Sequence, residues 1–211
     1  MADSSQIAGT GTQHASLPAG TTVQWRDTHN LQADDGSTTA APITGALTSS
    51  STATRYLEAS KFSHSIPAGA TINGIALEVD FTLAGNGVQD YDIRISGVTA
   101  GLSDNLSESA NLPSNTTKTW GGSSELWGKT WTIAELEADT FTAYISATGT
   151  SPSNFFSTNI DYVKTIVYYT EAGGGGGGGP DFNIKIGGQS ISRIMMGDQP
   201  VDRVNFGSTQ I

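Results

Sequence analysis

Residues 72–83 read INGIALEVDFTL, and this stretch decides the fold class. Apolar side chains stand at every second position: Ile75, Leu77, Val79, Phe81 and Leu83. The positions between them carry Ala76, Glu78, Asp80 and Thr82. Because successive side chains of a strand point to opposite faces, the stretch predicts a β-strand with one buried face.

The next stretch repeats this alternation. Within residues 90–98, the residues Tyr91, Ile93 and Ile95 recur at every second position and are followed by Val98. The Gly-Asn-Gly segment at 85–87 is a strong turn signal, so we expect the two strands to form a hairpin. Further strands are predicted at 55–66 (with a bend), 141–147 and 159–170, and a turn at 66–74.

One short helix is predicted. Thr132 and Glu135 have the spacing of a capping box, in which the first and fourth residues satisfy each other's backbone amides. The helix should end near Ala138, with Leu136 and Trp131 packed inward. Many strands, close turns and a single helical turn predict an all-β fold, an antiparallel β-sandwich or jelly roll.

Seven consecutive glycines at 173–179, followed by Pro180, mark the clearest boundary in the chain. Poly-glycine is too flexible to hold regular structure, so residues 173–180 are predicted to be a linker, either natural or engineered. The β-sandwich is predicted at 21–172. Residues 1–20 are polar and are expected to form an arm that orders only on a neighbour.

After the linker, residues 181–211 form a small module of short repeats. Units of ten residues begin at Ile184 and Ile194, and a shorter third unit begins at Val204. Each unit is interpreted as a short strand, a glycine turn and a second short strand. Units this small cannot bury a core alone, so we expect them to assemble with copies of themselves, as a homo-oligomer and plausibly a trimer. The alternative is a small meander docked on the sandwich. The expected assembly residues are Ile184, Ile186, Ile191, Ile194, Met196, Val201, Val204 and Phe206.

Composition narrows the function. The chain has 211 residues, with 20 acidic and 10 basic side chains, which disfavours nucleic-acid binding because phosphates need clustered Lys and Arg. It has no cysteine, so a disulfide and a thiolate metal site are excluded. The polar N-terminus predicts no secretory signal, and the short apolar runs predict no membrane span.

Motifs for catalysis are not found. His14, His29 and His64 lack the spacing of metal ligands and are interpreted as structural or solvated. No serine has the Gly-x-Ser-x-Gly pattern, and the glycine run is no P-loop. Two acidic pairs, Asp34-Asp35 and Asp90 with Asp92, are weak calcium candidates, the second pair on one strand face. We therefore expect a non-enzymatic protein with no cofactor and no metal.

Three tryptophans fall close together, at positions 120, 127 and 131. Trp127 and Trp131 are predicted to pack in the core. Trp120 is open between core packing and a platform on which a sugar ring stacks. In the second case the glycan contacts would be Trp120 with Asn115, Thr117 or Lys118.

The order of several motifs over residues 20–170 resembles a β-sandwich module of tailed-bacteriophage virion proteins. These motifs are Trp25 with NLQAD at 30–34, RYL at 55–57, Phe62 with IPAGATINGI at 66–75, GGSSELWG at 121–128 with Trp131-Thr132, and DYV at 161–163 with VYYT at 167–170. The C-terminal units resemble the Ile-x-x-Gly-x-x-x-Val-x-Arg repeats that end many phage tail and fibre proteins.

The resemblance implies a structural protein of the virion, assembled in the bacterial cytoplasm beside other virion proteins. It points to a tail fibre or baseplate, with a capsid decoration protein or head fibre as the alternative. A carbohydrate-binding module that recognises a host-surface glycan is a further alternative, from a different class. The resemblance carries over no catalytic residue.

Overall fold

The computed structural model describes residues 1–15, 17–18, 21, 23–43, 53–84, 88–97, 102–149 and 156–172, and the backbone of four short strands between 184 and 200. The chain divides into two compact units, Met1–Ala172 and Gly173–Ile211. The division falls at the predicted start of the linker, but the linker itself, residues 173–180, lies outside the described residues.

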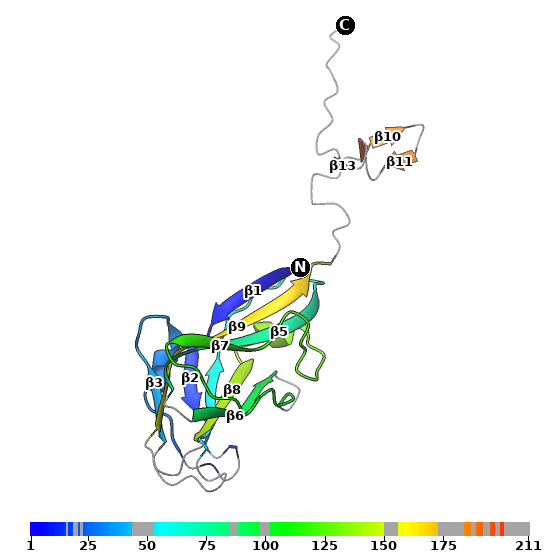
Figure 1. The fold of residues 1–211 in the computed structure, drawn as a ribbon. Helices are drawn as coiled ribbons and strands as arrows, with labels where there is room; N and C mark the ends of the chain where they lie inside the picture. Colours follow the sequence, from blue (N-terminus) through cyan, green and yellow to red (C-terminus); the bar gives the residue numbers. More distant parts are fainter. Residues whose placement is uncertain are drawn as a thin grey trace. The chain divides into compact units, whose positions relative to one another are not determined.

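The first unit contains two antiparallel sheets (Figure 1). The first sheet has the order β1 (Ala2–Ile7), β9 (Phe156–Thr170), β5 (Thr71–Ala84) and β7 (Thr116–Gly121), and β3 (Thr39–Ile43) also pairs with β9. The second sheet has the order β2 (Thr10–Gln13), β4 (Leu57–Ser60), β8 (Thr142–Gly149) and β6 (Val88–Ser96). The helices are short: η1 (Thr28–Gln32) and α1 (Ile133–Glu137). The all-β prediction is confirmed.

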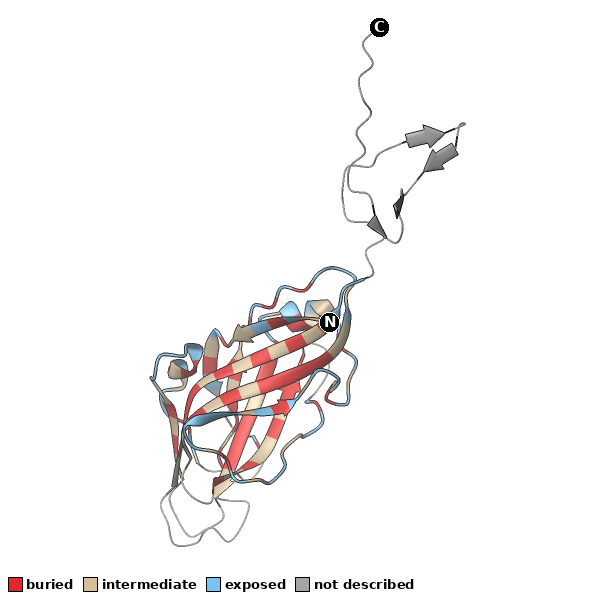
Figure 2. Ribbon diagram, turned by 45° about the horizontal axis from the view of Figure 1, so that its top comes forward, coloured by how far each residue is buried: buried red, intermediate tan, exposed pale blue. Residues whose placement is uncertain are grey.

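One hydrophobic cluster draws side chains from both sheets, as the alternating bands of buried residues in Figure 2 show. On β5 the predicted buried face is confirmed at Ile75, Leu77, Val79 and Phe81, each 0% exposed. The second sheet contributes residues such as Leu57, Ile93, Ile95 and Ile145. The two sheets therefore pack face to face as a β-sandwich.

The predicted hairpin between β5 and β6 is wrong. Strand β5 pairs with β7 and β9, whereas β6 pairs with β8 in the other sheet. The chain passes from one sheet to the other between them, through a segment (85–87) outside the described residues. A half-buried strand has the same alternation in either sheet, so the pattern could not show which partner it takes.

The N-terminal residues are not a separate arm. Strand β1 pairs with β9 from Ala2↔Tyr169 to Ile7↔Lys164, and β2 pairs with β4 in the other sheet. Ser4 is buried, and Ala2 packs against the core. Polar strands are stable here because their backbone groups complete the ladders of two well-buried neighbours.

Several local predictions are confirmed. The strands predicted at 141–147 and 159–170 are present as β8 and β9, although β8 spans Thr142–Gly149 and β9 starts at Phe156. The 66–74 turn closes with the Ala70 amide donating to the Pro67 carbonyl at 3.1 Å, and Gly69 has a φ of 78°. In α1 both capping-box hydrogen bonds are present, and Leu136 is buried.

The stretch 55–66 is shorter as a strand than predicted. Only Leu57–Ser60 forms β4, because Lys61 and Ser63 have φ values of 59° and 53°. Left-handed backbone of this kind ends a strand.

The second unit contains two antiparallel pairs of very short strands. Strand β10 (Ile184–Ile186) pairs with β11 (Gln189–Ile191), and β12 (Met195–Met196) pairs with β13 (Gln199–Pro200). Each pair falls within one of the first two predicted units. Residues 201–211, with the rest of the second unit and all of the third, lie outside the described residues.

Candidate functional site

A buried carboxylate joins the two sheets on the inside of the sandwich. Asp90 of β6 is 1% exposed and accepts hydrogen bonds from the Trp120 Nε1 of β7 at 2.9 Å and from the amides of Glu108 and Ala110 at 2.9 and 2.7 Å. The Lys118 ammonium lies 3.4 Å from the same carboxylate. Donors from both sides satisfy this charge, so Asp90 is a structural group.

This arrangement corrects the sugar-stacking prediction for Trp120. The ring is 2% exposed, meets the Phe81 ring edge to face with centroids 6.3 Å apart, and donates to Asp90. A covered ring offers no face to a sugar, so Trp120 is a core residue. Lys118 is held by Asp90 and Glu108, while Asn115 is exposed with a φ of 54° before β7. Asn115 and Lys118 are therefore not gathered around an exposed aromatic face.

Trp127 and Trp131 pack in the core, as predicted. They are 0% and 7% exposed. The Trp127 Nε1 donates to the Ile75 carbonyl at 2.8 Å, and the Trp131 Nε1 donates to the Leu126 carbonyl at 2.9 Å. Each indole thus buries its ring and satisfies its single donor.

His64 is a buried structural residue, as its alternation with Phe62 and Ile66 suggested. Its Nδ1 lies 3.1 Å from the Ser4 hydroxyl and its Nε2 lies 2.7 Å from the Thr165 hydroxyl. Burial lowers the pKa of His64 to about 4, because the charged imidazolium is poorly solvated there. His29 is exposed in η1.

The acidic pairs do not form a metal site. A β-bulge between Asp90 and Asp92 places Asp90 inside, while Asp92 pairs with Arg94 at 2.6 Å, so the prediction that they share a face is wrong. Near Asp34-Asp35, the Gly36 amide donates to Asp161 at 3.1 Å. Partial burial, then repulsion by Asp161, Asp34 and Glu78, raises the pKa of Asp80. Nowhere in the described part of the chain do three or more His, Cys, Asp or Glu residues form a group able to hold a metal ion.

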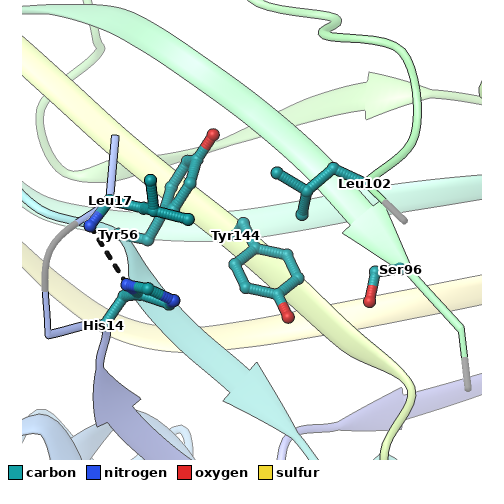
Figure 3. A pocket seen from close by; sticks show the side chains of 6 residues that line it. All are labelled: His14, Leu17, Tyr56, Ser96, Leu102 and Tyr144. Atoms are coloured by element: carbon teal, nitrogen blue, oxygen red, sulfur yellow. Dashed lines mark hydrogen bonds between the residues drawn. The ribbon is translucent and has the colours of Figure 1, made fainter. Parts of the chain in front are cut away.

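A hollow lies on the outer face of the second sheet, as shown in Figure 3. Its volume is about 250 Å³, and its lining comes from β6, from β8 and from residues just outside β2, β4 and β6. The lining residues are His14, Leu17, Tyr56, Ser96, Leu102 and Tyr144. Neither the hollow nor its tyrosines follow from any sequence motif.

Two tyrosines form the centre of this hollow. Their rings meet edge to face with centroids 5.3 Å apart. Tyr56 is 2% exposed, and its pKa is raised by burial and by the nearby Asp92 carboxylate. Tyr144 is half-buried and lies between His14 and Leu17 on one side and Leu102 and Ser96 on the other (Figure 3).

The rim at Leu17 is fixed by both of its backbone groups. Its amide donates to the His14 Nδ1 at 3.0 Å, and its carbonyl accepts from the Tyr56 amide at 2.8 Å. Since the His14 Nδ1 accepts, the ring proton lies on Nε2, which is 4.0 Å from the Glu58 carboxylate. The hollow is thus shaped before any ligand binds.

A row of polar side chains crosses the second sheet at the level of Tyr144. Tyr144 is paired with Glu58 on β4 and with Arg94 on β6, and Glu58 is paired with Thr12 on β2. The Thr12 hydroxyl donates to Glu58 at 3.1 Å, and Arg94 donates to Asp92 and to the Ser103 carbonyl. The site combines an aromatic floor with acceptors and donors at its edge, a combination that suits ligand binding.

The predicted assembly residues lie in the second unit. Ile184, Ile186, Ile191 and Met196 fall in the short strands, where only the backbone is described. Ile194, Val201, Val204 and Phe206 fall outside the described residues. Their role in assembly stays a prediction.

Comparison with known proteins gives no relative. The chain matches no family model, and neither a curated protein nor a solved structure is significantly similar to it. Among the helices that the structure describes, none is long and apolar enough to cross a membrane.

Proposed function

We propose that the chain is a non-enzymatic structural protein of a tailed-phage virion, exposed on the tail fibre or baseplate. In this proposal residues 181–211 assemble copies of the chain, and the β-sandwich is displayed to the outside. Other virion proteins are its partners, and the particle is its location.

The observation that carries the proposal is the division of the chain at Ala172/Gly173. On one side lies a sandwich whose buried acid, histidine and tryptophans make internal contacts. On the other lie strand pairs of two and three residues, which are too short to be stable as isolated hairpins in water. A self-sufficient module joined to one that needs copies of itself suits multivalent display.

The motif order that resembles phage virion modules supports the same proposal. Its residues lie at structurally decisive positions: Trp25 donates to the Arg55 carbonyl at 2.7 Å, and Trp127 donates to Ile75. The resemblance thus concerns residues that stabilise the sandwich. It supports a structural role more than a catalytic one.

Immunogold labelling tests the location. An antibody against the sandwich should label the tail or its tip on phage particles that encode this chain. Labelling spread over the head would instead support the capsid decoration alternative. Intact particles without the protein would contradict a virion role of either kind.

A further inference from the structure

The hollow on the second sheet gathers exposed apolar groups in an unusual way. Three large hydrophobic side chains are exposed among the described residues: Met1, Leu17 and Leu102. Two of them, Leu17 at 38% and Leu102 at 39%, flank the half-buried Tyr144. Exposed apolar groups that converge on one concave site indicate a ligand, whereas single scattered ones do not.

Polar groups border this apolar floor on both sides. Neighbouring strands lie about 5 Å apart, so Glu58 and Arg94 flank Tyr144 at that spacing. Ser96 and the Tyr144 hydroxyl add two groups that both donate and accept. The site therefore offers one apolar face with hydrogen-bonding groups around its edge.

We propose that this hollow binds one pyranose ring of a neutral saccharide. A pyranose has an apolar C–H face that fits Tyr144 and the two leucines, and hydroxyls at its rim that reach Glu58, Arg94 and Ser96. This assignment is independent of where the protein is located, so it stands or falls separately from the virion proposal.

Other ligand classes fit the lining less well. Two carboxylates, Glu58 and Asp92, stand near one permanent cation, Arg94, while the His14 ring is neutral because its Nδ1 accepts a hydrogen bond, so the charges around the hollow do not favour a phosphate. A wholly apolar ligand would cover the tyrosine and serine hydroxyls without giving them partners. A proline-rich peptide needs an extended aromatic groove, whereas about 250 Å³ is smaller than typical pockets for drug-sized ligands.

The hollow can be tested with the full chain and a panel of monosaccharides. Glucose, galactose, mannose, rhamnose and N-acetylglucosamine at millimolar concentration are screened by saturation-transfer NMR. At least one should receive saturation from the protein. For that sugar, Tyr144→Ala should weaken binding by about tenfold or more, since it removes the stacking surface.

Two milder variants keep the test valid if Tyr144→Ala impairs folding. Tyr144→Phe keeps the ring and should lose only a few-fold in affinity, whereas Glu58→Gln should lose more because its acceptor is weakened. Tyr162→Ala is the matched control: Tyr162 is a half-buried tyrosine on β9 of the other sheet, where it donates to Glu78 at 3.0 Å. It should leave sugar binding unchanged.

The proposal is overturned if no sugar of the panel receives saturation. It is also overturned if a folded Tyr144→Ala variant binds as the unaltered protein does, or if Tyr162→Ala weakens binding equally. Binding of a proline-rich peptide in place of every sugar would show that the hollow serves a different class of ligand.

Discussion

Both units of this chain contain paired β-strands, but the strands differ in length. In Met1–Ala172, strands of up to 15 residues pair in two sheets and bury a shared core. In the part of Gly173–Ile211 that the structure describes, the strands have two or three residues each. The first unit has what it needs to fold alone, and strand pairs as short as those in the second do not. We therefore expect substitutions in the first unit to change the stability of the fold and substitutions in the second unit to change self-association.

The largest effect is expected inside the sandwich, at Asp90. Asp90→Ala should lower the free energy of unfolding by about 3–5 kcal/mol, because it leaves the Trp120 indole and two backbone amides without their acceptor and removes one of the two carboxylates that hold Lys118. Urea unfolding of the full chain measures this change. Asp3→Ala, at an exposed position of β1, is the control and should stay within about 0.5 kcal/mol. Equal losses of unfolding free energy in Asp90→Ala and Asp3→Ala would show that the Asp90 carboxylate does not stabilise the contact between the two sheets.

A pH effect of about 3 kcal/mol is expected from His64. Its pKa is about 4 in the folded state against about 6.5 when unfolded, so only the unfolded chain takes up the proton between these values. Stability contributed by neutral His64 is therefore present above pH 6.5 and is lost as the pH falls toward 4. Urea unfolding at several pH values between about 4 and 6.5 gives the free energy of unfolding as a function of pH. In His64→Gln this free energy should depend less on pH than in the unaltered chain. The control is His29→Gln, which should keep the full pH dependence. If the pH dependence persists in His64→Gln and vanishes in His29→Gln, the effect does not come from His64.

A smaller effect is expected at the helix cap. Thr132→Ala removes the side chain that accepts from the Glu135 amide at 3.2 Å, and should cost about 1 kcal/mol. Thr132→Ser keeps the hydroxyl and should retain most of that stability. Thermal unfolding of both variants gives the comparison, and equal losses would mean that packing of the threonine methyl group outweighs the cap.

The smallest effect on the sandwich is expected from the second unit. Ile186→Ser and Ile191→Ser alter apolar positions of β10 and β11 and should leave unfolding of the sandwich within about 0.5 kcal/mol of the unaltered chain. The same variants should reduce self-association in sedimentation velocity. A clear loss of sandwich stability would instead favour the alternative that the repeats dock on their own sandwich.

Prediction from sequence succeeded where local chemistry decides the structure. The β5 face, the Pro67–Gly69 turn and the Thr132 capping box each depend on neighbours within a few residues. Prediction failed for strands whose pairing partners lie far away in the sequence. Strands β1, β2, β3 and β7 are polar or small in sequence and become strands through long-range pairing, for example Ala2 with Tyr169.

The candidate site was the hardest part to predict, for the same reason. Tyr144 lies on β8 and Tyr56 lies just before β4, and their hollow is completed by Leu17 and Leu102 from loops. The sequence instead drew attention to the tryptophan cluster, because three indoles within twelve residues are conspicuous. Two of these indoles have partners far away in sequence: Trp127 donates to the Ile75 carbonyl, and a bulge at Asp90–Asp92 turns an acid inward to meet Trp120.

Light scattering of the purified protein, with and without residues 173–211, tests the central claim most directly. The account predicts an oligomer, expected to be a trimer, for the full chain and a folded monomer for residues 1–172. Monomers in both cases would contradict assembly through the repeats, and oligomers in both cases would place assembly in the sandwich.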